Sequence, residues 1–269
     1  LPFVLRQSPA FVAWQDKILC PTIRLRSDTF NLREVLLDTA TRLGADRRVA
    51  ERAYEAGMSA LGQFRDRYLE AGRAALDKLA RTGETGMVLV GRPYNIHDPG
   101  VSLATARKLR DNYGVNVIPI DALPVADVDV RDLNENMFWE YGRKILAAAR
   151  LVSEHPNLHI VYVTNFKCGP DSFVRGFVRS ASGGKPFLTL QFDGHSNDAG
   201  MMTRCESYLD SKGILRWWRK QQDQPTEGAS KDGPSISHKW PTPVPDSWPP
   251  VSVPSGSKRS PLQTPIPKR

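Results

Sequence analysis

The sequence predicts an α/β protein with a parallel sheet of the Rossmann or flavodoxin type. A long helical segment precedes this sheet, and a disordered tail follows it. Three observations carry the prediction: helical periodicity before residue 84, alternation of short apolar runs with helix-like stretches up to residue 213, and proline-rich composition after it. They divide the chain into residues 1–31, 32–83, 84–213 and 214–269.

The first two regions differ in their pattern. Residues 1–31 contain Pro2, Pro9 and Pro21 and predict an irregular lead-in. Residues 32–44 and 46–81 predict helices, because apolar residues recur at spacings of three, four or seven. Asp46 is a plausible N-cap of the second helix and Gly83 a plausible stop, so this helix would run for roughly 50 Å and brace a domain.

The third region alternates between two kinds of run. The apolar β-runs are 87–91, 115–121, 158–166 and 185–194, and the helix-like stretches are 101–113, 135–153, 172–182 and 198–209. This alternation is typical of a doubly wound parallel sheet, in which loops at the carboxyl ends of the strands carry the chemistry.

The last region, 214–269, is basic and rich in proline. Eleven of the chain's 21 prolines lie between Pro225 and Pro267, a composition that predicts disorder. From residue 214 onward there are nine Lys or Arg against four Asp or Glu, so this region carries +5 of the net charge of +8. The basic charge therefore belongs mostly to the tail, which argues against nucleic acid as a partner of the folded part.

Composition also limits the compartment. With 40% hydrophobic residues, no stretch near the roughly 18 apolar residues of a membrane span and no signal-peptide pattern, the chain is expected in the cytoplasm and away from membranes. Three cysteines are too few and too scattered for a disulfide framework. Because the first residue is Leu, we expect the chain to be either processed or the C-terminal part of a longer one, and we favour the second.

Polar segments follow all four β-runs. In the loop after the first run, Arg92 offers a planar donor fork for phosphate or carboxylate, and Asn95 adds polar reach. The alternative is that Arg92 pairs with Asp98 to hold a turn. In the loop after the fourth run, His195 with its neighbouring carboxylates suits acid–base work or a divalent metal, or else a hydrogen-bonded scaffold, with Asp198 as the helix N-cap.

The loop after the third run contains Cys168, directly before a helix that begins near Asp171 or Ser172. Backbone N–H groups and the dipole at a helix start stabilise a thiolate, which is the form needed for nucleophilic attack or for holding iron. The alternative is a small buried residue. Cys20 also follows a short apolar run, whereas Cys205 lies inside the last predicted helix and is expected in the core.

The motifs of several enzyme classes are missing. The chain has no GxxxxGK[ST], GxGxxG, CxxC, HExxH or GxSxG pattern. We therefore expect no ATP site in this segment.

Read together, "VLVGRPYNIHDPGVSLATARKLRDNYGVNVIPIDALP", "NLHIVYVTNFKCGPDSF", "KPFLTLQFDGHSNDAGMMTR" and the upstream "CPTI" resemble the C-terminal part of the 2-hydroxyacyl-CoA dehydratase superfamily. The nearest resemblance is to the large CoA-substrate-specific enzyme activases. It covers roughly residues 17–209, and residues 1–31 would then be the remainder of a truncated upstream lobe.

The resemblance implies an iron–sulphur cluster, with the 4Fe-4S type suspected, and Cys20 and Cys168 as its ligands. It also implies low-potential electron transfer driven by an upstream ATPase module or a separate activator protein, with a homodimer or a related subunit as a further possible partner. Such a chain would be a component of an ATP-driven reductase or of a 2-hydroxyacyl-CoA dehydratase system. Two cysteines do not complete a cluster, which usually needs four ligands.

The leading hypothesis is therefore an iron–sulphur electron-transfer domain that is incomplete in this chain. Its predicted cofactor-binding residues are Arg92, Asn95, Asp171, Ser172 and His195. The alternative is a Rossmann-like binding module without a cluster, for a CoA-like or phosphorylated ligand. A third hypothesis is a non-catalytic fragment whose basic tail recruits a partner.

Overall fold

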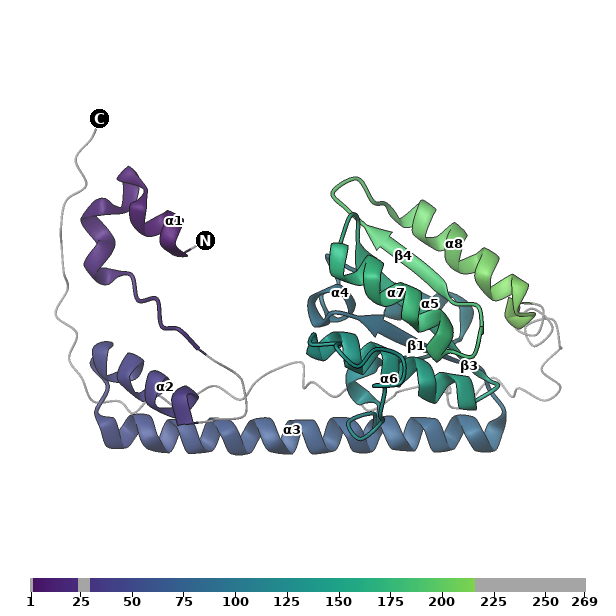
Figure 1. The fold of residues 1–269 in the computed structure, drawn as a ribbon, viewed down its shortest axis with the longest axis horizontal. Helices are drawn as coiled ribbons and strands as arrows, with labels where there is room; N and C mark the ends of the chain where they lie inside the picture. Colours follow the sequence, from purple (N-terminus) through teal and green to yellow (C-terminus); the bar gives the residue numbers. More distant parts are fainter. Residues whose placement is uncertain (1, 24–29, 216–269) are drawn as a thin grey trace, which may run out of the picture. The chain divides into compact units, whose positions relative to one another are not determined.

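The computed structural model describes residues 2–23 and 30–215. Its centre is a parallel sheet of β1 (Gly86–Gly91), β2 (Asn116–Pro119), β3 (Leu158–Asn165) and β4 (Leu188–Phe192), as Figure 1 shows. The strand order is β2-β1-β3-β4. The predicted α/β fold class is thus confirmed, while the predicted disordered tail falls on residues outside those described, apart from its first two.

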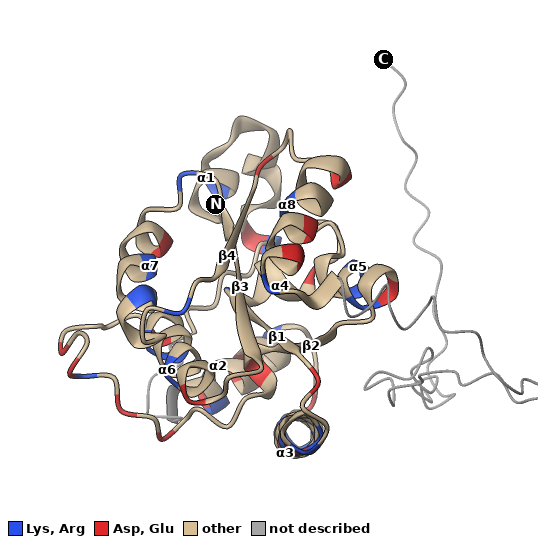
Figure 2. Cartoon of the chain, turned by 90° about the vertical axis from the view of Figure 1, so that its right-hand side faces the viewer, with Lys and Arg blue, Asp and Glu red and all other residues tan. Residues whose placement is uncertain are grey.

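Helices cover both faces of the sheet. In Figure 2, α6 (Glu140–Glu154) and α7 (Gly169–Ala181) lie on one side, and α5 (Thr105–Tyr113) and α8 (Asp198–Ser211) lie on the other. The short α4 (Pro93–His97) follows β1 directly. The two central strands, β1 and β3, are buried on both faces, which is why they read in the sequence as apolar runs without alternation.

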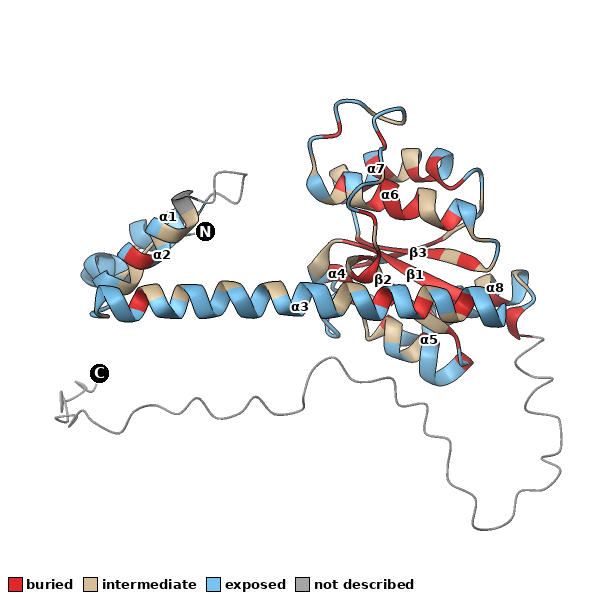
Figure 3. Cartoon of the chain, turned by 90° about the horizontal axis from the view of Figure 1, so that it is seen from below, coloured by how far each residue is buried: buried red, intermediate tan, exposed pale blue. Residues whose placement is uncertain are grey.

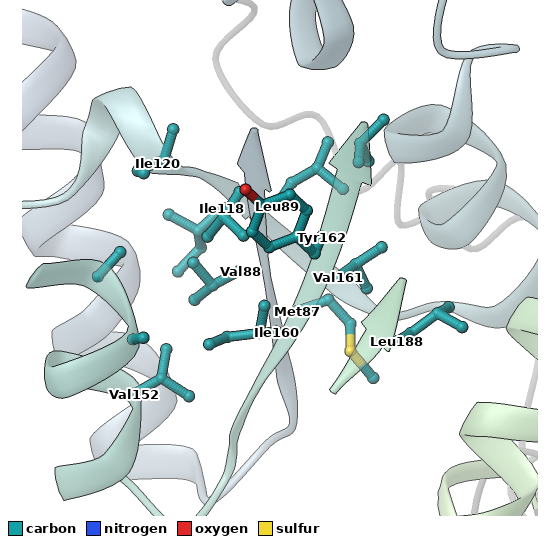
Figure 4. Close-up of a cluster of buried hydrophobic side chains, with 14 of the residues drawn as sticks. Met87, Val88, Leu89, Ile118, Ile120, Val152, Ile160, Val161, Tyr162 and Leu188 are labelled. Atoms are coloured by element: carbon teal, nitrogen blue, oxygen red, sulfur yellow. The ribbon is translucent and has the colours of Figure 1, made fainter. Parts of the chain in front are cut away.

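The core consists of side chains from these layers. Val88, Ile160 and Tyr162 face α6 and α7, since residues on one strand alternate between the faces and the neighbouring strands are paired in register (Figure 4). Met87 and Val161 point to the opposite face. All five side chains are at most 2% exposed.

The two helices predicted before the sheet are present. They are α2 (Phe30–Arg42) and α3 (Arg47–Thr82). The side chain of Asp46 accepts hydrogen bonds from two backbone N–H groups at the start of α3, and Gly83 ends it in the left-handed conformation with φ of 68°. With 36 residues, α3 is about 54 Å long.

Helix α3 has two different surroundings. Its first turns pair with α2 through ion pairs such as Arg33–Glu51 and Arg47–Glu34. Its last turns pack on the sheet domain through Ala75 and Leu79, which are both buried. Figure 3 shows α3 as mostly exposed, with short buried patches along its length. The stretch between them is largely exposed.

Several sequence-based boundaries need correction. Residues 2–17 are not irregular: they form α1 (Pro2–Gln7) and the 3-10 helix η1 (Pro9–Lys17), because a proline in the first turn needs no hydrogen-bond donor. The second β-run ends early, at Pro119, where the turn η2 (Ile120–Ala122) begins. Helix α7 starts at Gly169 rather than near 171, again because its first turn accommodates a proline, Pro170.

Candidate functional site

The connection between strands creates a switch point at β1 and β3. The chain leaves β1 to form β2 on one side and then returns to place β3 on the other side of β1. In open α/β sheets, ligands bind in the crevice at the carboxyl ends of such a pair of strands. Here β1 ends at Gly91, where a Cβ would lie 2.4 Å from the carbonyl oxygen of Val163, so glycine allows the two strand ends to approach.

An ion pair joins the loops that follow these two strands. Arg92 Nη2 lies 3.2 Å from Oδ1 of Asp171, which is 2% exposed on α7. Thr164 Oγ1 donates a hydrogen bond of 2.5 Å to the other carboxylate oxygen of Asp171. The structure therefore brings two predicted site residues together, with Asp171 buried as the inner partner.

The predicted alternative partner of Arg92 is not used. Asp98 instead accepts hydrogen bonds from the backbone N–H groups of Gly100 and Val101, at 2.8 and 3.0 Å. The turn after α4 is thus held by the carboxylate of Asp98. Arg92 is left to bridge β1 and α7.

Unsatisfied polar atoms gather at the switch point. Among the described residues, five buried side-chain polar atoms have no hydrogen-bond partner, and four of them belong to Asn95, Tyr162 and Asp171. Both amide atoms of Asn95 are affected, although its side chain is 1% exposed. Asp171 Oδ1 is also among these atoms, so its ion pair with Arg92 does not have the geometry of a hydrogen bond. Buried polar groups are normally paired, so this concentration marks a place suited to a polar ligand.

Tyr162 lies beneath this ion pair. It shares a face of β3 with Thr164, two residues further along, and Thr164 contacts Asp171. Burial raises the pKa of Tyr162, and the charge of Asp171 raises it further. Its hydroxyl therefore keeps its proton and remains a hydrogen-bond donor without an acceptor.

Cys168 is the N-cap residue of α7 and is half-buried. Its backbone oxygen accepts hydrogen bonds from the backbone N–H and the hydroxyl of Ser172, the latter at 2.8 Å. The side chain of Cys168 makes no capping hydrogen bond. The preceding Lys167 adopts a left-handed φ of 59°, which turns the chain sharply between β3 and α7.

The other predicted metal ligand, Cys20, lies outside the sheet domain. It is half-buried and follows η1. No hydrogen bond or ion pair joins it to the described residues of the switch point. Cys205, by contrast, is in the core as predicted: it is fully buried beside Met201, and burial raises the pKa of its thiol to about 11.

His195 lies in a self-contained loop after β4. Its backbone N–H donates to Asp193 Oδ1 at 2.9 Å, and this bond, with a second from Ser196, lowers the pKa of Asp193. The helix N-cap is Asn197, not Asp198 as predicted; Asp198 pairs with Lys108 of α5 at 2.5 Å. The loop thus has the hydrogen bonds expected of a structural scaffold, which was the predicted alternative to an acid–base or metal site.

Sequence reasoning missed a second polar cluster, centred on Asp121 in η2. The carboxylate accepts hydrogen bonds from His97 Nε2 at 2.8 Å, from Tyr141 at 2.9 Å and from Lys144. Burial opposes the charge, but these three donors outweigh it and hold the pKa of Asp121 well below its usual range. The only signal was a carboxylate at the end of a predicted strand; its partners on α6 lie 20 residues or more away in the sequence.

Two findings bear on metals and membranes. Within residues 2–23 and 30–215, no group of three or more His, Cys, Asp or Glu side chains is arranged to hold a metal ion. None of the helices in the same ranges is long and apolar enough to cross a membrane.

Comparison with known proteins gives one match. Residues 1–123 match the family model of the CoA enzyme activase uncharacterised domain (DUF2229). This match confirms the resemblance to a CoA enzyme activase-type family. The matched residues run from the N-terminal helices through α3 and β1 to η2. They extend across the domain boundary predicted at residue 83 and do not mark it, so the predicted domain boundaries stay predictions. No curated protein and no solved structure matches the chain.

Proposed function

We propose that this chain is the α/β component of a CoA enzyme activase-type electron-transfer system, in which Cys168 supplies one thiolate ligand of an iron–sulphur cluster. The observation that carries the proposal is the place of Cys168. It lies at the switch point, at the start of a helix, half-buried and with a side chain that caps no backbone group.

The described residues could supply some of the ligands of such a cluster and not all of them. A four-iron cluster usually takes four thiolate ligands, and the described ranges hold no group of three metal-binding side chains. Cys205 is buried in the core and is not available. We therefore derive no electron-transfer step within this chain; Cys20 would be a second ligand, and the others would come from an upstream module, a related subunit or a second copy.

Iron content tests this proposal. The chain, purified without oxygen and supplied with iron and sulphide, is expected to turn brown and to retain both elements. Cys168→Ser and Cys20→Ser should each lower the bound iron, because each removes a thiolate. Cys205→Ala is the matched control and should retain the iron of the unaltered chain. Equal iron in all four proteins, or none in the unaltered chain together with its upstream module, would sink the assignment.

A second candidate function rests on Asn95. Both atoms of its buried amide lack partners beside Arg92, which is the arrangement expected where a polar or phosphorylated ligand such as CoA binds without a cluster. Calorimetry with CoA should then show saturable binding that Arg92→Ala weakens and Cys168→Ser leaves unchanged. Binding that Cys168→Ser abolishes would instead favour the cluster.

The partners follow from the proposed function. Low-potential electron transfer needs a source of electrons, for which an ATP-hydrolysing activator or an upstream ATPase module is the candidate. A cytoplasmic location is part of the same proposal, since exposed iron–sulphur ligands require a reducing compartment.

A further inference from the structure

An acidic loop lies beside α6. We define the acidic loop as residues 126–136, in which four acidic side chains stand against one basic side chain, a net charge of −3. The acidic side chains are all exposed, namely Asp127, Asp129, Asp132 and Glu135. Arg150 of α6 fixes the loop, because its guanidinium donates to Asp132 Oδ2 at 2.6 Å and to the backbone oxygen of Asp129.

Helix α7 has the opposite charge. We define the basic helix face as Lys167, Arg175 and Arg179. Lys167 directly precedes the N-cap of α7, and the two arginines lie about one turn apart on the helix. In the described part of the chain, no ion pair involves any of the three. The one acidic residue of α7, Asp171, is buried and pairs with Arg92, so the outward charge of this helix is positive.

Exposed aromatic side chains lie between these two regions. Phe138 follows the acidic loop by two residues and is 75% exposed, whereas Phe173 precedes Arg175 by two residues and is 50% exposed. We call Phe138 and Phe173 the aromatic centre. Trp139, which packs against the core, connects them: the centroid of its ring lies 4.6 Å from that of Phe138 and 5.9 Å from that of Phe173.

The surface therefore has an ordered pattern of charge. It runs from the acidic loop through the aromatic centre to the basic helix face, and Figure 2 shows the loop, α6 and α7 on the same side of the sheet. Such a pattern is complementary to itself. A two-fold axis through the aromatic centre would place the acidic loop of each copy against the basic helix face of the other, with the aromatic side chains in the middle.

From this pattern, we propose that the surface is the contact between two copies of the chain, related by a two-fold axis at the aromatic centre. A second copy fits better than a nucleic acid, because the acidic loop would repel phosphate groups along half of the surface. Gly176 lies on α7 between Phe173 and Arg179 and has open space around it, so the other copy can approach the helix there. The contact does not rest on the proposed function.

Sedimentation velocity of the full chain without metal tests the contact. The chain is expected to show a monomer–dimer equilibrium from micromolar to submillimolar concentration, and added salt should weaken it by screening the opposite charges. A chain that stays monomeric over this range would overturn the proposal. Oligomers that continue beyond the dimer would also overturn it, because a two-fold contact closes with two copies.

Two charge-reversed variants test the pairing of the flanks. Arg175→Glu combined with Arg179→Glu makes the basic helix face acidic, and Asp127→Lys combined with Glu135→Lys makes the acidic loop basic. Each variant alone should dimerise at least about tenfold more weakly, because like charges then meet. An equimolar mixture of the two should regain the affinity of the unaltered chain, since each flank again meets its opposite. A mixture as weak as the separate variants would contradict the two-fold contact.

Matched controls separate this surface from effects of net charge and of folding. Arg107→Glu combined with Arg110→Glu makes the same change of charge on α5, on the other side of the sheet, and should leave the dimer unchanged (Figure 2). Equal weakening by this pair would overturn the proposal.

The aromatic centre has a test of its own. Phe138→Ala combined with Phe173→Ala should weaken the dimer at least about thirtyfold, because aromatic anchors at the centre of an interface carry most of its affinity. Both side chains are at least 50% exposed, so circular dichroism should show an unchanged fold. An unchanged dimer would overturn the proposal. Binding of a single-stranded oligonucleotide by a monomeric chain, lost on reversing Arg175 and Arg179, would identify a nucleic-acid site instead.

Discussion

Two polar clusters at the carboxyl edge of the sheet differ in how completely their atoms are paired. Asp121, after β2, accepts hydrogen bonds from His97, Tyr141 and Lys144. Asp171, after β3, has one short hydrogen bond from Thr164 and an ion pair to Arg92 without hydrogen-bond geometry. Asp121 lies in η2, directly after β2, and Asp171 lies in the first turn of α7, after β3, so the two carboxylates follow the strands on either side of β1.

This difference distinguishes polar groups that hold the fold together from polar groups that are available to a ligand. A fully paired buried network holds elements in place, whereas buried atoms without partners lower stability and persist where a ligand or a movement uses them. The Asp121 cluster ties η2 to α4 and α6. The Asp171 cluster, with Asn95 and Tyr162 beside it, has the incomplete pairing expected of a binding site.

The largest expected effect comes from Asp121→Asn. The substitution leaves the ammonium group of Lys144 without its carboxylate, so the free energy of unfolding should fall by about 3 kcal/mol in urea denaturation. Asp129→Asn is the control, because Asp129 pairs with Arg131 on the exposed surface and its loss should have no measurable effect. Equal stability of the two variants would contradict the structural role of Asp121.

The same residue predicts a pH dependence. Folding lowers the pKa of Asp121, so its stabilising contribution is present above the ordinary aspartate pKa of about 4 and is lost as the pH falls below it. The difference in unfolding free energy between the unaltered chain and Asp121→Asn should therefore be constant from neutral pH to about pH 5 and shrink in stronger acid. A difference that grows in acid would show that another group is responsible.

Two glycines of α3 compare a part of the helix that packs against η2 with a part that has open space around it. A Cβ at Gly72 would lie 1.7 Å from the backbone oxygen of Ala122, so Gly72→Ala should destabilise the chain by about 2 kcal/mol. Gly57 has open space, and Gly57→Ala should stabilise α3 by about 0.5 kcal/mol. Thermal unfolding measures the stability of both variants. A loss of stability in both would mean that the contact with η2 does not account for the effect at Gly72.

The smallest effect compares two tyrosines. Tyr141→Phe removes a hydroxyl that donates to Asp121 and should cost about 1 kcal/mol of unfolding free energy. Tyr162→Phe removes a hydroxyl without a partner and should change the stability by less than about 0.5 kcal/mol, or raise it. A larger loss for Tyr162→Phe than for Tyr141→Phe would show that its hydroxyl is paired in solution.

The elements of the sheet domain and the long helix before it could be predicted because their signals are local. A strand buried on both faces must be apolar throughout, and a helix needs a start such as Asp46 and an end such as Gly83. Boundaries were less accurate where proline allows more than one structure. Pro2 and Pro9 begin helices here, although the same residues also occur in irregular segments.

Local sequence is enough to predict that polar loops follow the strands and that Cys168 stands directly before a helix, because both depend on neighbours in the chain. The strand order, and with it which loops meet, depends instead on contacts between distant parts of the chain. That order brings Arg92 to Asp171, 79 positions later in the chain, rather than to Asp98 nearby, and it surrounds Asp121 with donors from α4 and α6. Such pairings depend on distances across the sheet, which no local pattern records.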